Sequence, residues 1–119
     1  MATTLWVNLP LEQVLEKIED GVTGLSLTGQ LIDTYTVDGG NGHRCIVQVY
    51  EKYYYRSSNY ASLTVTVDDF ASNDSSGCTR VHLMGSGGSG SVFNFFDWGA
   101  SSSFEDVAQQ ALQEWIIRS

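Results

Sequence analysis

Hydrophobic positions repeat with two different periods along this chain. Between Leu9 and Asp20 they recur at spacings of three and four residues, with charged residues between them. This spacing places the apolar side chains on one face of a helix. Pro10 suits the first turn and Gly21 the end, so the pattern predicts a helix over residues 9–20. The apolar positions are Leu11, Val14, Leu15 and Ile18.

From Gly24 onward the period changes to two, which is typical of strands. The first long strand carries Leu31, Tyr35 and Val37 on one side, and the glycine-rich segment 38–42 predicts a tight turn into the next strand. The expected strands cover residues 3–7, 24–37, 44–55, 60–67 and 79–84.

Strand alternation also predicts which side chains face the core. Every second residue of the strand 60–67 is apolar, so one face of this strand is buried and the other is not. We assign the valines of each strand to the inner face. The inward residues are then Cys45, Val47, Val49, Ala61, Leu63, Val65, Val67, Val81 and Leu83.

A glycine- and serine-rich segment over residues 85–91 interrupts the strands. We interpret it as an irregular loop that leads to a last strand in the apolar run 92–98. Ser102 and Ser103 each precede an acidic residue by three positions, which is typical of a helix start. Apolar residues then recur at helical spacing as far as Ile116, which predicts a long C-terminal helix.

The predicted fold is of the α+β class. It is an antiparallel meander sheet of about five to six strands, with an N-terminal helix and a long C-terminal helix packed on one face. The element order is β-α-β-β-β-β-β-α, and residues 1–119 form one domain. This order resembles the saddle-shaped fold of the TATA-binding protein and the helix-grip fold of small lipid-binding proteins. The resemblance is one of topology, and topology does not transmit function.

Two helices can cover only one face of such a sheet, so we expect the other face to stand open. Its side chains include tyrosines together with most of the basic residues, and tyrosine and arginine are favoured at binding surfaces. We predict an interaction module that binds a protein partner or a second copy of itself as a homodimer, the alternative being a solvated face. The candidate binding residues are Arg44, Tyr50, Lys52, Tyr54, Arg56, Tyr60, Arg80 and His82.

Charge and cysteine content narrow the partners and the compartment. With 14 acidic and 6 basic residues the net charge is −8, which disfavours nucleic acids and anionic membranes as partners. The chain shows no signal-peptide pattern and no stretch as long as a membrane span. Two cysteines are too few for a disulfide scaffold, so we expect a cytoplasmic protein.

The residues that match nucleotide-binding and metal-binding motifs lack the structural context that such sites need. Glycines at 85, 87 and 90 match G-x-G-x-x-G, but a strand follows them where a dinucleotide site needs a helix. Residues of the types that bind zinc are present, but the assigned alternation puts the two cysteines on opposite faces of the sheet. We therefore expect no cofactor and no metal. The zinc-ligand types are His43, Cys45, Cys78 and His82.

Two other function classes stay open. The first is a carrier for a small apolar ligand, of helix-grip type, with a cavity between the sheet and the C-terminal helix. The second is an enzyme, the less favoured alternative, because no local motif joins a nucleophile to a base. The aromatic residues that would line the cavity are Phe93, Phe95, Phe96, Trp98, Phe104 and Trp115.

Overall fold

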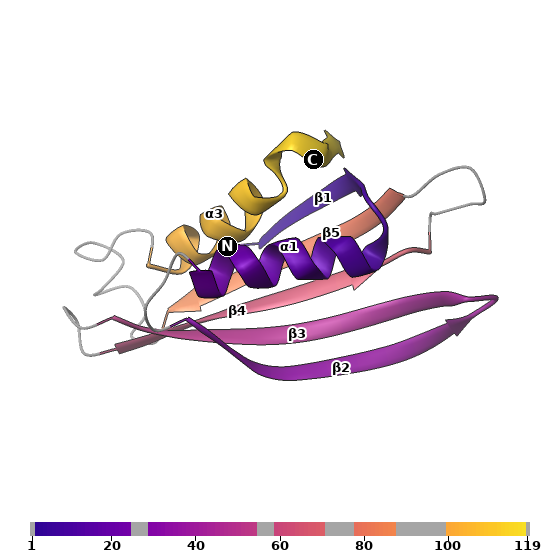
Figure 1. Cartoon of the computed structure of the whole chain (residues 1–119). Helices are drawn as coiled ribbons and strands as arrows, with labels where there is room; N and C mark the ends of the chain where they lie inside the picture. Colours follow the sequence, from indigo (N-terminus) through magenta and orange to yellow (C-terminus); the bar gives the residue numbers. More distant parts are fainter. Residues whose placement is uncertain (1, 25–28, 55–58, 71–77, 88–99, 119) are drawn as a thin grey trace.

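A computed structural model describes residues 2–24, 29–54, 59–70, 78–87 and 100–118 (Figure 1). Six antiparallel strands form one sheet in the order β2-β3-β4-β5-β1-β6, accompanied by helices. The elements are β1 (Ala2–Asn8), α1 (Leu11–Gly24), β2 (Gln30–Gly40), β3 (His43–Tyr54), β4 (Asn59–Asp68), β5 (Cys78–Gly87), α3 (Ala100–Ala111), the 3-10 helix η1 (Gln113–Trp115) and β6 (Ile116–Arg118).

The two ends of the chain complete the sheet. Strands β2 to β5 follow one another as the predicted meander, and β1 then pairs with β5 on one side and with β6 on the other. The strand expected at residues 3–7 is β1, and it lies inside the sheet with a neighbour on each side. The predicted helix also ends too late, since α3 stops at Ala111 and Ile116 begins a strand.

Helix α1 is longer than its sequence pattern indicated. Gly21 does not end it, and the helix continues by one turn to Gly24, with Val22 fully buried. Gly21 instead permits a close approach of the two helices, since a Cβ at this position would lie 2.8 Å from the Cβ of Ala111 in α3. This contact fixes α3 beside α1 above the sheet (Figure 1).

The β2–β3 hairpin is confirmed, and it contains an irregularity that the pattern did not show. Its turn uses positive φ angles at Gly40, Asn41 and Gly42, as the glycine-rich segment predicted. Along the strands, however, the register shifts between Leu31 and Asp33. Because a bulge of this kind adds one residue to one strand, positions of the same parity before and after it face opposite sides of the sheet.

One hydrophobic cluster joins α1, α3 and one face of the sheet. Each valine or leucine that is fully buried there contributes about 1.5–3 kcal/mol relative to an exposed position. Among the described residues, no helix lies over the opposite face of the sheet (Figure 1). The buried cluster contains Leu5, Val7, Leu9, Leu11, Val14, Ile18, Val22, Ile46, Tyr50, Ala61, Leu63, Val65, Val67, Val81, Leu83, Ala108 and Leu112.

Some predictions fall on residues that the structure does not describe. The expected strand at residues 92–98 lies outside the described residues, as does most of the glycine-rich loop 85–91. In the part of the chain that is described, no helix combines the length and the apolar character needed to cross a membrane.

Candidate interaction surface

The uncovered side of the sheet, which we call the open face, is defined by the strand register. Leu63, Val65 and Val67 of β4 point into the core, so the residues between them point outward. Paired residues of neighbouring strands point to the same side of the sheet, so the pairing gives the orientation of the side chains on the other strands. The outward, half-buried or exposed side chains of the open face include Thr4, Trp6, Asp33, Tyr35, Val37, Cys45, Val47, Val49, Glu51, Tyr53, Tyr60, Ser62, Thr64, Thr66, Cys78, Arg80, His82 and Met84.

The predicted orientation of β3 is wrong. Ile46 and Tyr50 pair with the inward residues Val67 and Leu63, so the even positions of β3 face the helices and the odd positions face outward. Val47 therefore belongs to the open face and not to the core. The sequence was ambiguous here because both sides of β3 carry apolar side chains, and only pairing with β4 decides between them.

Three candidate binding residues consequently leave the open face. Tyr50 is fully buried, and its hydroxyl donates a 2.9 Å hydrogen bond to the side-chain oxygen of Gln48. Arg44 forms an ion pair with Glu12 of α1, on the helix side of the sheet. Lys52 pairs with the buried Ala61 and so has the same orientation as Tyr50.

Burial changes the ionisation of Tyr50. The low polarity around its hydroxyl raises the pKa of Tyr50 well above its ordinary value, and the negative charges of Glu19 and Asp20 add to the rise. Both carboxylates belong to α1, which is consistent with a ring that lies beneath that helix. A neutral, fully buried tyrosine is part of the core and offers nothing to a partner.

The other candidate binding residues divide into two groups. Tyr60, Arg80 and His82 do lie on the open face, as predicted, although whether they bind a partner is still a prediction. The side chain of Tyr54 and the whole of Arg56 lie outside the described residues.

The open face is more apolar than the sequence suggested. Tyr35 and Val37 of β2 lie beside Val47 and Cys45 of β3, which gives a continuous apolar area across two strands. Tyr35 is 64% exposed and Met84 of β5 is 52% exposed. The alternation in the sequence predicts Tyr35 and Val37 on the same side as Leu31, and the bulge after Leu31 makes that prediction wrong.

Two pairs of polar side chains on the open face bind each other. Arg80 donates a 2.8 Å hydrogen bond from Nε to Asp68, which is 5% exposed. Thr4 and His82 share a 2.8 Å hydrogen bond between the hydroxyl and Nδ1. The Arg80–Asp68 pair neutralises its own charge, and all four groups have a partner within the surface before any second molecule arrives.

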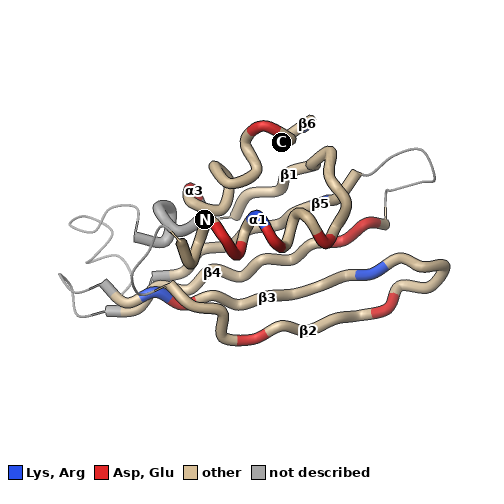
Figure 2. Tube along the Cα trace, viewed as in Figure 1, with Lys and Arg blue, Asp and Glu red and all other residues tan. Residues whose placement is uncertain are grey.

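Acidic residues gather on the other side of the molecule. Figure 2 shows acidic positions along α1, whose exposed residues include Glu12, Glu16, Glu19 and Asp20. The described part of the open face has the ion pair Arg80–Asp68 together with Asp33 and Glu51. The strongest concentration of negative charge therefore lies on the helix side, away from the open face.

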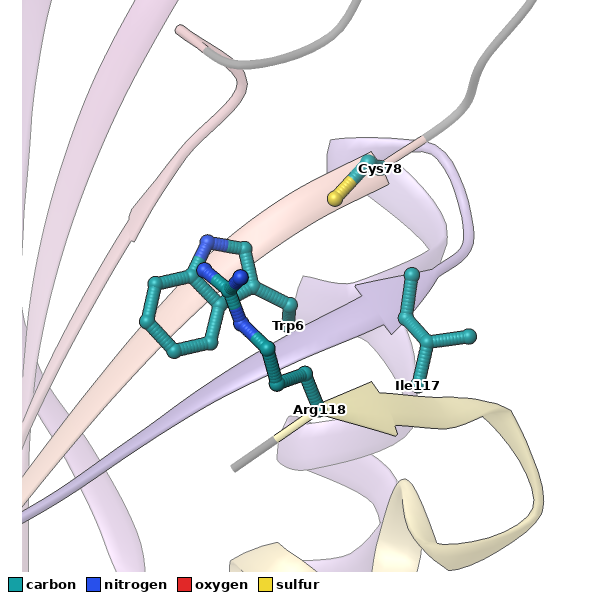
Figure 3. Close-up of a pocket in the computed structure, with 4 residues that line it drawn as sticks. All are labelled: Trp6, Cys78, Ile117 and Arg118. Atoms are coloured by element: carbon teal, nitrogen blue, oxygen red, sulfur yellow. The ribbon is translucent and has the colours of Figure 1, made fainter.

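A hollow opens at one corner of the open face, where β1, β5 and β6 meet (Figure 3). Its volume is about 400 Å³, and its lining residues are Trp6, Cys78, Ile117 and Arg118. The Arg118 guanidinium carbon lies 4.0 Å from the centre of the Trp6 ring, a cation–π geometry. This hollow lies on the opposite side of the sheet from α3, so it is not the cavity expected for a helix-grip carrier.

Sequence reasoning missed the hollow. Trp6 alternates with the buried Leu5 and Val7, which was a usable signal that it points outward from a strand. Arg118 gave no such signal, because Ile116 had been assigned to a helix that in fact ends earlier.

The four zinc-ligand residue types lie on strands that are not neighbours. With β3 reversed, Cys45 and Cys78 both face the open side, which overturns the argument from alternation. Strand β4 nevertheless separates them, and neither thiol forms a disulfide. Within the described residues, no group of three histidine, cysteine or acidic side chains is placed to hold a metal ion.

The fold and this surface define a protein of the α+β class, with a six-stranded antiparallel sheet that helices cover on one side. The chain belongs to a family of unknown function, DUF6054, whose model matches residues 1–116. Comparison with curated proteins and with solved structures finds no match.

Proposed function

We propose that this protein is an interaction module that self-associates, with the open faces of two copies packed against each other. The observation that carries the proposal is the placement of exposed apolar residues. Seven large apolar side chains of the described residues are exposed, and four of them lie on the open face. The four are Tyr35, Val37, Tyr60 and Met84.

The size of the open face supports a dimer. Strands such as β4 and β5 have 10 residues. With a rise of about 3.3 Å per residue and a strand spacing of about 4.8 Å, five strands of this length present roughly 800 Å². Specific interfaces bury about 800 Å² per partner, so a stable dimer would use most of the open face.

Charge restricts the orientation in which two copies can meet. The net charge of the chain is −8, so two copies repel each other in most orientations. Packing the open faces together turns the acidic exposed surface of α1 away from the contact in both copies. An isologous contact of this kind is also the commonest form of symmetric association.

Two adjacent residues of β2 provide a matched test. Tyr35 faces the open side, whereas Thr34 pairs with Gln48 and faces the helix side, where it is also exposed. Tyr35→Asp and Thr34→Asp therefore add the same charge to the same strand on opposite faces. Size-exclusion chromatography with light scattering, over a range of protein concentrations, measures the result.

We expect a dimer for the unsubstituted chain and for Thr34→Asp. In Tyr35→Asp we expect the dimer to dissociate at concentrations at least about tenfold higher, because burying an unpaired carboxylate in each half of the interface costs several kcal/mol. A chain that stays monomeric at all concentrations, or equal behaviour of the two variants, would overturn the proposal.

The remaining predictions from the sequence are untested. Neither Cys45 nor Cys78 forms a disulfide, which fits a reducing compartment and supports the proposed cytoplasmic location. No described residue favours catalysis or a ligand cavity between the sheet and α3, so we do not propose the enzyme or the helix-grip carrier as the function.

A further inference from the structure

The hollow at the corner of the open face has the properties of a small-ligand site. Its volume of about 400 Å³ falls within the range of small-molecule pockets, roughly 300–1,000 Å³. Three of its four lining side chains, Trp6, Cys78 and Ile117, are apolar or weakly polar, and Ile117 is 60% exposed beside it. An apolar group placed there would cover surface that water now contacts.

Arg118 is the one charged residue among the described residues that line the hollow. Among the described residues no carboxylate forms an ion pair with it, and its guanidinium is held over the indole of Trp6. Arg80 is the cross-strand neighbour of Trp6, but it is already neutralised by Asp68. A ligand entering the hollow therefore meets one oriented guanidinium that no described carboxylate neutralises.

A planar guanidinium suits a carboxylate, because the two groups form paired hydrogen bonds. Stacking on Trp6 also reduces the side-chain freedom that Arg118 would lose when a ligand binds. We propose that the hollow binds a small apolar monocarboxylate, with its carboxylate on Arg118 and its apolar body along Trp6 and Ile117 toward Cys78 (Figure 3).

Cys78 allows occupancy of the hollow to be measured directly. Its thiol lines the hollow, whereas the thiol of Cys45 lies on the open face two strands away. The experiment follows alkylation of both cysteines by iodoacetamide in the full chain, by mass spectrometry of peptides, at increasing octanoate concentration. Burial, with the charge of Asp68, raises the pKa of Cys45, so each thiol is compared with its own rate without octanoate.

We expect octanoate to slow alkylation of Cys78 saturably, by about tenfold once nine-tenths of the sites are filled. The rate at Cys45 should stay unchanged. Octylamine and 1-octanol have the same chain without the carboxylate and should give little protection at the same concentration. Equal protection by 1-octanol would overturn the assignment of the carboxylate to Arg118.

Two variants distinguish binding of octanoate in the hollow from a general effect of octanoate on the protein. Arg118→Gln should raise the octanoate concentration for half-protection by roughly tenfold or more, since bonds to a charged group are lost. Lys17→Gln is the matched control, because Lys17 also stacks on a tryptophan, at 4.2 Å from the Trp115 ring, away from the hollow. It should leave protection unchanged.

Two results would refute the proposal: no protection of Cys78 at any octanoate concentration, or identical protection in Arg118→Gln. The dimer proposal is tested by a different signal in the same experiment. Dimer formation through the open face would shield Cys45 in a manner that depends on protein concentration, whether or not octanoate is present.

Discussion

Tyr50 provides the sharpest test of the strand orientation on which the open face depends. In the structure its ring is fully buried and its hydroxyl donates to Gln48, which is itself 5% exposed. Tyr50→Phe keeps the ring and removes only the donor. A buried acceptor then loses its partner, which costs about 1–3 kcal/mol of unfolding free energy.

A double-mutant cycle isolates this hydrogen bond. Gln48→Leu alone should also destabilise the fold, because the Tyr50 hydroxyl is left buried without an acceptor. The double variant replaces both partners by apolar groups, so its loss should be smaller than the sum of the two single losses by about 1 kcal/mol. Tyr35→Phe is the control, and at an exposed position it should change stability by less than about 0.5 kcal/mol.

The pH dependence gives a second, independent measure. Burial raises the pKa of Tyr50 above its ordinary value of 10.0, so the folded state holds this proton more tightly than the unfolded state. The resulting stability is fully present below pH 10 and is lost as the pH rises further. Relative to Tyr50→Phe, the unsubstituted chain should lose about 1.4 kcal/mol per pH unit above pH 10.

Urea denaturation followed by circular dichroism measures all these free energies. If Tyr50 faced solvent, as the sequence pattern indicated, Tyr50→Phe would match Tyr35→Phe within about 0.5 kcal/mol. The two pH profiles would then also run parallel. Either outcome would refute the orientation of β3 and, with it, the composition of the open face.

Three further stability predictions follow from packing and can be checked by thermal or urea denaturation. Leu63→Ala, at a fully buried site of β4, should cost about 2–5 kcal/mol. Gly21→Val should cost about 1–3 kcal/mol, since even its Cβ meets Ala111 at 2.8 Å; no loss would refute the close approach of α1 and α3. Gly24→Ala meets no atom within 4 Å, so it should instead stabilise the protein by about 0.4–1 kcal/mol.

Local patterns were sufficient wherever one choice was clearly favoured. On β4, Leu63 and Val65 alternate with threonines and serine, so only one orientation buries apolar surface. The glycine-rich turn of the β2–β3 hairpin follows from the need for positive φ angles. The α+β character, the antiparallel sheet and the existence of α1 could all be predicted on this basis.

The candidate site was harder to predict than the fold because it depends on orientation. A one-residue shift exchanges every side chain of a strand between the two faces. On β3 the sequence offers Ile46 and Tyr50 on one side and Val47 and Val49 on the other, which is no clear choice. The valines of β3 were predicted to face the core. Five of the eight candidate binding residues were selected because they alternate with these valines.

The sequence by itself determined helix α1 and strands β1 to β5, because turn chemistry and hydrophobic period act within a few residues, but it did not determine strand β6. Tertiary pairing alone decided which side of β3 joins the core, since the inward residues of β4 bury Ile46 and Tyr50. It also decided that Arg118 lies beside Trp6, because β6 pairs with β1 from the far end of the chain. Local sequence patterns do not encode contacts between distant segments. Such contacts form both the open face and the hollow.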